Sequence, residues 1–264
     1  MKRFSMLHAL YLSFFSGDLY RNVRTNWKGT GFLYLLLLLS ITWVPVMAKV
    51  HWVVSEVITQ EAPKYIDQVP KITIQRGEVS IDRPVPYSIS IPEGGMPLLV
   101  IDTSGSITSV EQTKALALLT KNKFMYSKQT GSETRIYDLS KIDNFTLDRD
   151  LVNTWVQVFR KYFATLAYPF ALAASFTYRI LQMLLYAAIG MIFVKILKVQ
   201  LDYLAVLRLA SVSITPAIIF STLQMLTGFH IPAYWIICFA IAMGYLFFAV
   251  KSNAVQTSPE APEV

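Results

Sequence analysis

The sequence predicts a polytopic α-helical membrane protein with four transmembrane helices and a small α+β extracytoplasmic domain inserted between helices 1 and 2. Two observations lead to this fold class. Apolar residues make up 54% of the chain and charged residues only 16%, whereas soluble domains carry about 25% charged residues. The apolar residues also gather in long runs on either side of a segment in which apolar and polar residues alternate.

The first run, residues 29–48, contains no ionisable side chain. Because about 20 apolar residues suffice for one helical crossing, we expect the first span at 30–48. A cleaved signal peptide is the alternative, since Val46-Met47-Ala48 fits a small-x-small cleavage site. The segment before this run is long and itself apolar, which favours an uncleaved anchor.

The second run, residues 163–197, is interrupted only by Arg179 and Lys195. Two helices within it would each be too short to cross a membrane, and no Gly or Pro turn divides it. We therefore expect one long helix from about residue 147 to 198, whose membrane span covers 172–196.

The third run, residues 209–250, is uncharged and too long for a single crossing. Gly228 and Pro232 near its midpoint indicate a hairpin turn. The sequence thus predicts two further spans at about 204–226 and 232–250, with a kink at Pro216 in the first of them.

Residues 4–15 predict an apolar, aromatic helix ahead of the first span. Such a helix can lie in the membrane interface, or it can pack against the ends of the other helices. The sequence leaves both alternatives open.

The segment after the first span alternates with a period of two, as β-strands do, at residues 72–74, 79–81 and 87–91. Residues 98–101 read as a short buried strand, and Val110 to Leu119 as one helix. Two further strands, at 124–126 and 135–137, flank a hairpin turn at 129–132. Five or six strands and a helix suffice for a small α+β domain.

The formal net charge of +7 is distributed as a topology signal. Residues 1–30 hold five basic groups and one acidic group, a net +4, whereas residues 49–162 hold 14 basic and 13 acidic groups, a net +1. Because Lys and Arg accumulate in cytoplasmic flanks, we expect both termini in the cytoplasm and residues 49–150 outside. The positive net charge therefore reflects insertion into the lipid bilayer with a cytoplasmic N-terminal flank, and we expect no nucleic-acid partner.

Five stretches of the sequence form a recognisable set. They are Phe14-Phe15-Ser16-Gly17-Asp18-Leu19-Tyr20-Arg21-Asn22-Val23, Trp27-Lys28-Gly29-Thr30-Gly31, Val100-Ile101-Asp102-Thr103-Ser104-Gly105, Leu118-Leu119-Thr120-Lys121-Asn122-Lys123 and Tyr137-Asp138-Leu139-Ser140. Together they resemble a bacterial membrane-protein family called domain of unknown function 1189. The resemblance implies a multi-pass protein of the bacterial cytoplasmic (inner) membrane, distantly similar to Yip1-type membrane proteins, and it implies no catalytic residues.

Asp102, Ser104 and Ser106 follow a buried strand and form a D-x-S-x-S pattern. Carboxylate and hydroxyl oxygens in this pattern suit a hard cation, but too little chain follows for the repeated strand–helix units that such a metal-binding fold needs. The other interpretation is that Asp102 and Ser104 shape a turn. An aspartyl enzyme is less favoured still, since no second copy of the motif exists to pair two carboxylates.

Arg179 is the most unusual residue, because a charge within a membrane span is costly and indicates function by default. It can instead snorkel toward the interface, as Arg208 can. The functional alternative is an intramembrane polar site for lipid phosphate or an anionic solute, formed by Arg179, Gln182, Arg208 and Gln224.

The sequence gives little support for a metal site or a reactive thiol. The three histidines are scattered and Cys238 is the single cysteine, whereas zinc requires about four ligands. We expect no cofactor and assign Cys238 to packing.

These observations favour a non-enzymatic integral membrane protein that binds, senses or assembles with a membrane or extracytoplasmic protein partner through its external domain. A carrier or channel for a lipid or anionic solute is the alternative, and an enzyme using Asp102 is third. The expected parts are a cytoplasmic interfacial helix (1–29), transmembrane helix 1 (30–48), the extracytoplasmic domain (49–150), a long helix with transmembrane helix 2 (151–198), transmembrane helices 3 and 4 (199–250) and a disordered cytoplasmic tail (251–264).

Overall fold

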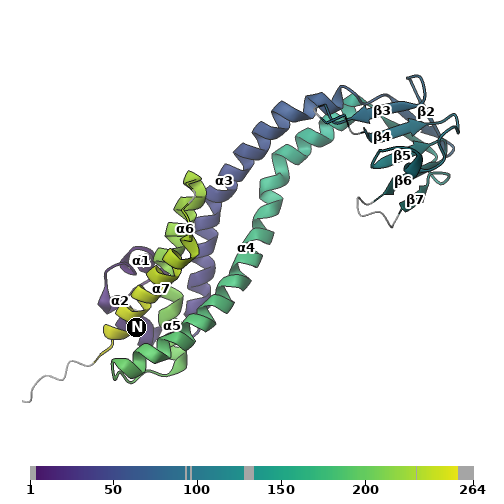
Figure 1. Cartoon of the computed structure of the whole chain (residues 1–264). Coiled ribbons are helices and arrows are strands. Elements are labelled where there is room, and N and C mark those ends of the chain that lie inside the picture. The colour runs from purple at the N-terminus through teal and green to yellow at the C-terminus, as the bar shows by residue number, and fades with distance from the viewer. Residues whose placement is uncertain (1–3, 93, 96, 128–133, 230, 255–264) are drawn as a thin grey trace, which may run out of the picture. The chain divides into compact units, whose positions relative to one another are not determined.

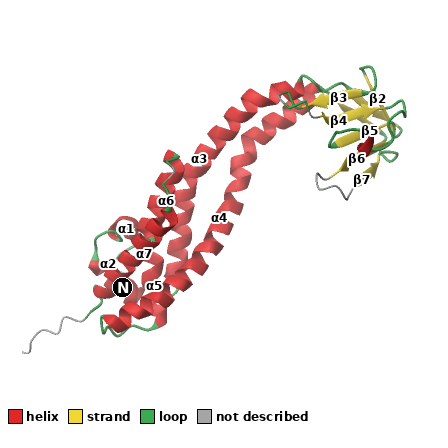
Figure 2. Ribbon diagram, in the orientation of Figure 1, coloured by secondary structure: helices red, strands yellow, loops and turns green. Residues whose placement is uncertain are grey.

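The computed structural model describes residues 4–92, 94–95, 97–127, 134–229 and 231–254. The chain forms two compact units, a helical unit made of residues 1–50 and 164–264 and an inserted unit made of residues 51–163. All described strands belong to the inserted unit (Figures 1 and 2). The expected turn at 129–132, His230 and residues 255–264 of the expected tail lie outside the described residues.

Four helical segments are long and apolar enough to cross a membrane, which confirms the predicted number. The third segment consists of two helices, α5 and α6, because Pro216 lies in the first turn of α6 and its ring nitrogen has no hydrogen to donate. The helices are α3 (Thr30–Ile66), α4 (Arg149–Ile196), α5 (Tyr203–Ser213), α6 (Thr215–Thr227) and α7 (Tyr234–Lys251).

Helix α3 does not end near residue 48, where the first uncharged run ends, but continues to Ile66. The added residues 49–66 mix helix formers such as Glu56, Gln60 and Glu61 with β-branched and aromatic residues. Their charges end the uncharged run at residue 48 but do not end the helix. Helix α4, by contrast, begins and ends within two residues of the predicted bounds.

The N-terminal segment contains two short helices. Helix α1 (Met6–Leu12) lies within the predicted helix at 4–15, and a second helix, α2 (Gly17–Asn26), follows it. Ser16 caps α2, since its Oγ accepts a hydrogen bond from the backbone N–H of Leu19, and α2 packs against α5 and α7. Ala9 of α1 is fully buried in the core of the helical unit, whereas Leu7 and Tyr11 are exposed, so one side of α1 packs against the bundle.

The core of the helical unit joins all of its long helices. The Tyr34 hydroxyl lies 2.7 Å from Thr215 Oγ1, which connects α3 to α6. At Gly190 of α4 an added Cβ would lie 2.6 Å from Cγ1 of Val206. Only glycine permits this approach of α4 to α5.

The inserted unit contains two sheets. Three antiparallel strands form the first, in the order β2-β1-β8, and five strands form the second, in the order β3-β4-β5-β6-β7, in which only β4 and β5 run parallel. The strands are β1 (Ile72–Gln75), β2 (Glu78–Ile81), β3 (Tyr87–Ser90), β4 (Pro97–Asp102), β5 (Ala117–Thr120), β6 (Lys123–Ser127), β7 (Thr134–Asp138) and β8 (Asn144–Leu147).

The larger sheet is buried on both faces at its centre. Ile101 and Leu119 pack with the apolar residues of the smaller sheet, whereas Val100 and Leu118 pack on the opposite face against the segment that connects β4 to β5. The prediction of one helix from Val110 to Leu119 is therefore wrong. The structure has a 3₁₀ turn, η1 (Val110–Gln112), followed by strand β5. A strand buried on both faces lacks the alternation that distinguishes it from a helix.

The two ends of the inserted segment meet. Ile72 of β1 pairs with Leu147 of β8, and Nε of Arg149 donates a hydrogen bond of 3.1 Å to the carbonyl oxygen of Val69. The chain thus enters and leaves the two sheets at the same place.

Candidate functional site

The first candidate, the loop after β4, is organised around the carboxylate of Asp102, which is fully buried. Its Oδ1 accepts hydrogen bonds from Ser104 Oγ (2.6 Å) and from the Ser104 backbone N–H (2.9 Å). Its Oδ2 accepts from Ser106 Oγ (3.0 Å) and from the Ile107 backbone N–H (2.6 Å). The D-x-S-x-S pattern therefore directs its hydroxyl groups inward, to the aspartate.

These hydrogen bonds determine the protonation state of Asp102. Burial alone raises the pKa of a carboxyl group, but the side chain and N–H of Ser104, the N–H of Ile107 and the side chain of Ser106 outweigh it and lower the pKa of Asp102 from 3.8 to about 2. The carboxylate is ionised and fully satisfied by the chain itself. Among the described residues, no cluster of three His, Cys, Asp or Glu side chains is spaced to hold a metal ion. This is the geometry of a turn.

The second candidate is a pocket of about 450 Å³ in the helical unit, within the size range of small-molecule sites. Helices α3, α4, α6 and α7 all contribute to it. Its lining residues are Leu39, Thr42, Trp43, Val46, Ser175, Tyr178, Arg179, Gln182, Ile218, Ser221, Thr222, Gln224, Met225, Gly228, Phe229, Tyr234, Trp235 and Cys238. We call this the Arg179 pocket.

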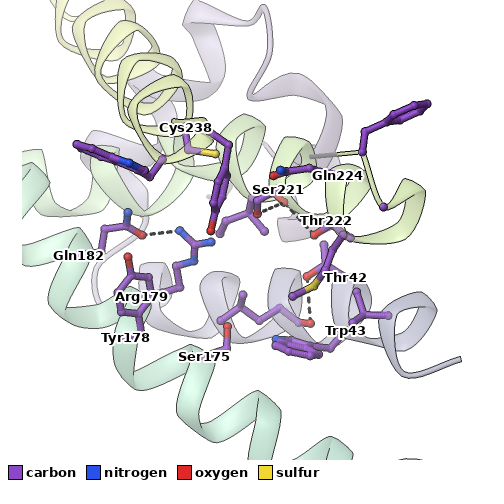
Figure 3. A pocket seen from close by; sticks show the side chains of 18 residues that line it. Thr42, Trp43, Ser175, Tyr178, Arg179, Gln182, Ser221, Thr222, Gln224 and Cys238 are labelled. Atoms are coloured by element: carbon purple, nitrogen blue, oxygen red, sulfur yellow. Dashed lines mark hydrogen bonds between the residues drawn. The ribbon is translucent and has the colours of Figure 1, made fainter. Parts of the chain in front are cut away.

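Helix α4 positions the guanidinium group of Arg179. One of its terminal nitrogens (Nη1) donates a hydrogen bond to Oε1 of Gln182, one helical turn away. The amide of Gln182 is oriented in turn, since its Nε2 donates to the hydroxyl of Tyr186 over 2.7 Å. Figure 3 shows the guanidinium directed from α4 into the pocket.

The guanidinium has fewer partners than its charge requires. Nε of Arg179 is buried and has no hydrogen-bond partner among the described residues. None of the described lining residues is Asp or Glu, so the pocket carries a positive charge without a neutralising carboxylate. The ring of Tyr178, with its centroid 5.5 Å from the guanidinium carbon, offers a cation–π contact. A half-buried guanidinium whose Nε is buried without a partner suits an anionic ligand.

The hydroxyl groups across the pocket are occupied as donors but remain acceptors. Ser221 and Thr222 both donate to the carbonyl oxygen of Ile218 (2.9 Å each), and Thr42 donates to that of Leu39 (3.2 Å). These three hydroxyl groups are therefore available to a ligand as acceptors only.

The structure brings together three of the four residues of the predicted polar site, Arg179, Gln182 and Gln224. Arg208 does not join them, which corrects the prediction. It lies on α5, where its Nη1 donates to the carbonyl oxygen of Arg24, and it lines another pocket. The reason is that Arg208 lies in the middle of α5, and no described residue of α5 lines the Arg179 pocket, which this part of the chain reaches only from Ile218 of α6 onward.

Sequence reasoning missed most of the wall opposite Arg179. Ser175 precedes Arg179 by four residues and Gln182 follows it by three, so their common helix face was open to prediction. Trp43, Ser221 and Trp235 come from other helices, and nothing in the sequence indicates which of their faces meet. Cys238, assigned to packing, lines the pocket with its sulfur 4.0 Å from the carbonyl oxygen of Ala217.

Comparison with known proteins assigns the chain to a family. A family model described as "Protein of unknown function (DUF1189)" matches residues 7–250. An uncharacterized protein of Rickettsia prowazekii (strain Madrid E) is 21% identical over 174 residues, which cover 61% of this chain and 59% of that relative's length. No solved structure matches. Because the family model covers nearly the whole chain, the protein belongs to the DUF1189 family.

Proposed function

We propose that this protein is a non-enzymatic integral membrane protein whose helical unit binds an anionic, partly apolar ligand in the Arg179 pocket. The observation that carries the proposal is the guanidinium of Arg179, which lies in a pocket without a described carboxylate and has a buried Nε without a partner. A charge in such surroundings is costly, and an anionic ligand supplies the missing acceptors.

The other lining residues define the rest of the ligand. Trp43, Phe229 and Trp235 provide aromatic surface, which matches an acyl chain or another apolar group. Carboxylate and phosphate both fit a guanidinium through paired hydrogen bonds. The ligand class is thus a carboxylate or phosphate attached to an apolar body. Binding of such a ligand is required both of a carrier and of a receptor.

The proposal includes an orientation. With both termini in the cytoplasm of a bacterial cell and the spans in its inner membrane, the inserted unit is extracytoplasmic. The net charge of +4 in residues 1–30 supports this arrangement. Gly228 and Phe229, in the α6–α7 turn, line the Arg179 pocket, so the pocket belongs to the outer half of the bundle.

Tryptophan fluorescence tests the proposal, because Trp43 and Trp235 line the pocket. The full chain in neutral detergent is titrated with 9,10-dibromostearate, whose bromines quench nearby tryptophans, and with its uncharged methyl ester. We expect saturable quenching by the acid and weaker binding of the ester. Arg179→Met should weaken binding of the acid about tenfold, the equivalent of about 1.4 kcal/mol.

Two variants control for charge and fold. Arg179→Lys keeps the charge and should retain part of the affinity, whereas Lys195→Met removes an exposed charge from the same helix and should change nothing. Equal binding of acid and ester, or an unchanged affinity in Arg179→Met, would refute the proposal.

A specific observation also supports the assembly with a protein partner that the composition suggests. Strand β7 is an edge of the larger sheet, all of its residues are exposed, and they include Ile136 and Tyr137. The opposite edge, β3, is covered at Ser90, whose N–H and carbonyl both bond the side chain of Gln68. An open apolar edge strand can accept a strand from a partner.

Site-specific photocrosslinking in native membranes tests this second role. A crosslinker at Ile136 should give a discrete adduct with a second protein, and one at the exposed Ser88 of β3 should not. Absence of an adduct at Ile136, or equal adducts at both positions, would argue against a partner at β7.

A further inference from the structure

A second pocket, of about 420 Å³, lies where the start of α3 meets α4 and α5. It shares no lining residue with the Arg179 pocket. Helix α3 reaches it at Gly31 and Phe32, and the other pocket from Leu39 onward. We call it the Arg208 pocket. Its lining residues are Lys28, Gly29, Gly31, Phe32, Met183, Leu204, Leu207, Arg208 and Ser211.

Two cationic side chains line this pocket, and neither is neutralised. Lys28 is exposed and takes part in no ion pair or hydrogen bond of its side chain within the described residues. Arg208 donates one hydrogen bond to a neutral acceptor, the carbonyl oxygen of Arg24. The lining contains no acidic residue.

The acidic residues nearest in the sequence have other partners. Asp18 pairs with Arg21 at 2.9 Å. Asp202 caps α5 by accepting a hydrogen bond from the N–H of Ala205. The positive charge of the Arg208 pocket therefore remains available to a ligand.

Glycine lets the start of α3 form one wall of this pocket. Gly29 and Gly31 both line it, and a Cβ at Gly31 would lie 2.7 Å from Ser211 Oγ, so glycine allows α3 to contact α5 here. The charge of the pocket therefore comes from Lys28 and Arg208, which favour an anion.

The remaining wall is apolar. Phe32, Leu204 and Leu207 contribute carbon surface beside the two cations, and Phe32 and Leu204 are exposed. A free anion would gain nothing from that surface, whereas the acyl chain of a lipid would bury it. Basic pockets between transmembrane helices are known as sites for anionic headgroups.

We propose that the Arg208 pocket binds the phosphate group of an anionic phospholipid, with Lys28 and Arg208 at the phosphate and an acyl chain along Phe32 and Leu207. The site is separate from the proposed Arg179 site, because the two pockets share no lining residue, and its proposed ligand is a membrane phospholipid that is recognised by its headgroup phosphate. Free phosphate has the same anionic chemistry but lacks the apolar part.

Native mass spectrometry of the full chain in neutral detergent tests the proposal. The probes are dioleoyl phosphatidylglycerol, which is anionic, and dioleoyl phosphatidylcholine, which is zwitterionic. We expect tighter binding of the phosphatidylglycerol. Lys28→Met should weaken it about fivefold, since one cation near the membrane surface contributes about 1 kcal/mol. Lys28→Arg should retain the wild-type preference.

Further arms assign the effect to this pocket and to a lipid. Lys195→Met should leave the lipid preference unchanged. Lys28→Met should weaken phosphatidylglycerol binding by the same factor in the wild-type and the Arg179→Met backgrounds, so failure here and failure of the Arg179 proposal are distinguishable. Inorganic phosphate at millimolar concentration should not displace the lipid. Equal binding of the two lipids, an unchanged affinity in Lys28→Met, or displacement by inorganic phosphate would each overturn the assignment.

Discussion

The inserted unit buries the ionised side chain of Asp102, the helical unit half-buries that of Arg179, and the two units provide hydrogen-bond partners for these charges in opposite ways. The carboxylate of Asp102 receives four hydrogen bonds from the loop that it organises. The guanidinium of Arg179 donates one hydrogen bond to Gln182, and its Nε has no partner among the described residues. The chain itself satisfies the hydrogen-bonding groups of the Asp102 carboxylate but leaves the Nε of Arg179 without a described partner.

This difference separates a charge that the fold satisfies from one that has donors left for a ligand. A buried ion that is fully hydrogen-bonded stabilises the local fold, and its removal leaves its donors unsatisfied. A buried ion with vacant donors costs free energy until a ligand arrives. The extent of burial does not distinguish the two cases, whereas the number of hydrogen-bond partners does.

The largest expected effect is that of Asp102→Ala in the full chain. It removes the charged acceptor of the Ser104 and Ile107 N–H groups, whose hydrogen bonds are partly buried, and this should cost about 3 kcal/mol. Hydrogen exchange of the β4 and β5 amides should accelerate about a hundredfold as a result. Asp102→Asn, which keeps the shape, should have a smaller effect. Unchanged hydrogen exchange in Asp102→Ala would contradict the structural role of the Asp102 carboxylate.

Acid should reproduce part of this loss in the wild type. The pKa of Asp102 in the folded protein, about 2, lies below its ordinary value of 3.8. The stability that its ionised form contributes is therefore complete above the ordinary value and is lost as the pH falls from 3.8 through about 2. Exchange of the β4 amides measured across this window should respond in the wild type and not in Asp102→Asn. Identical profiles would contradict the assignment.

Arg179→Met should have the opposite sign in the ligand-free protein. Replacing an incompletely bonded buried charge with an apolar side chain is neutral or stabilises by about 1 kcal/mol, so the melting temperature in detergent should hold or rise. Arg208→Met is the matched control and should lower it, because Arg208 bonds the carbonyl of Arg24. A clear loss of stability in Arg179→Met would make Arg179 structural.

The smallest expected effect is that of Ser106→Ala, which removes one of the four donors to Asp102. We expect a loss of about 1 kcal/mol, seen as faster exchange in β4. Ser88→Ala is the control, since its hydroxyl bonds only another exposed hydroxyl, that of Ser90, and its exchange should match the wild type. Equal effects of the two substitutions would mean that the hydroxyl groups around Asp102 act independently of it.

The apolar runs and the period-two pattern sufficed to predict the helices and most strands. Four long apolar helices and the α6–α7 turn were predicted because long uncharged runs and Gly or Pro signals are local features. Strand β5 was mistaken for part of a helix, because Leu118 and Leu119 are buried on opposite faces of one sheet. An uninterrupted apolar run is expected both for a strand that is buried on its two faces and for a buried helix.

The candidate site was predictable along one helix and not between helices. Arg179 and Gln182 are one turn apart on α4, so their contact follows from spacing. The separation of Arg208 from them depends on which ends of α3 and α5 meet, and that is a property of tertiary packing. Likewise, the sequence shows the hydroxyl groups after Asp102, but only the structure shows that they are directed to it.

The pairing of β1 with β8 and the bond from Arg149 to Val69 bring the two ends of the inserted segment together. A segment whose two ends lie next to each other can be inserted, deleted or exchanged in evolution without changing the path of the flanking helices. A short turn in place of residues 70–148 would leave α3 and α4 joined as a simple helical hairpin. The two sheets can therefore diversify under their own selection while the helices retain theirs.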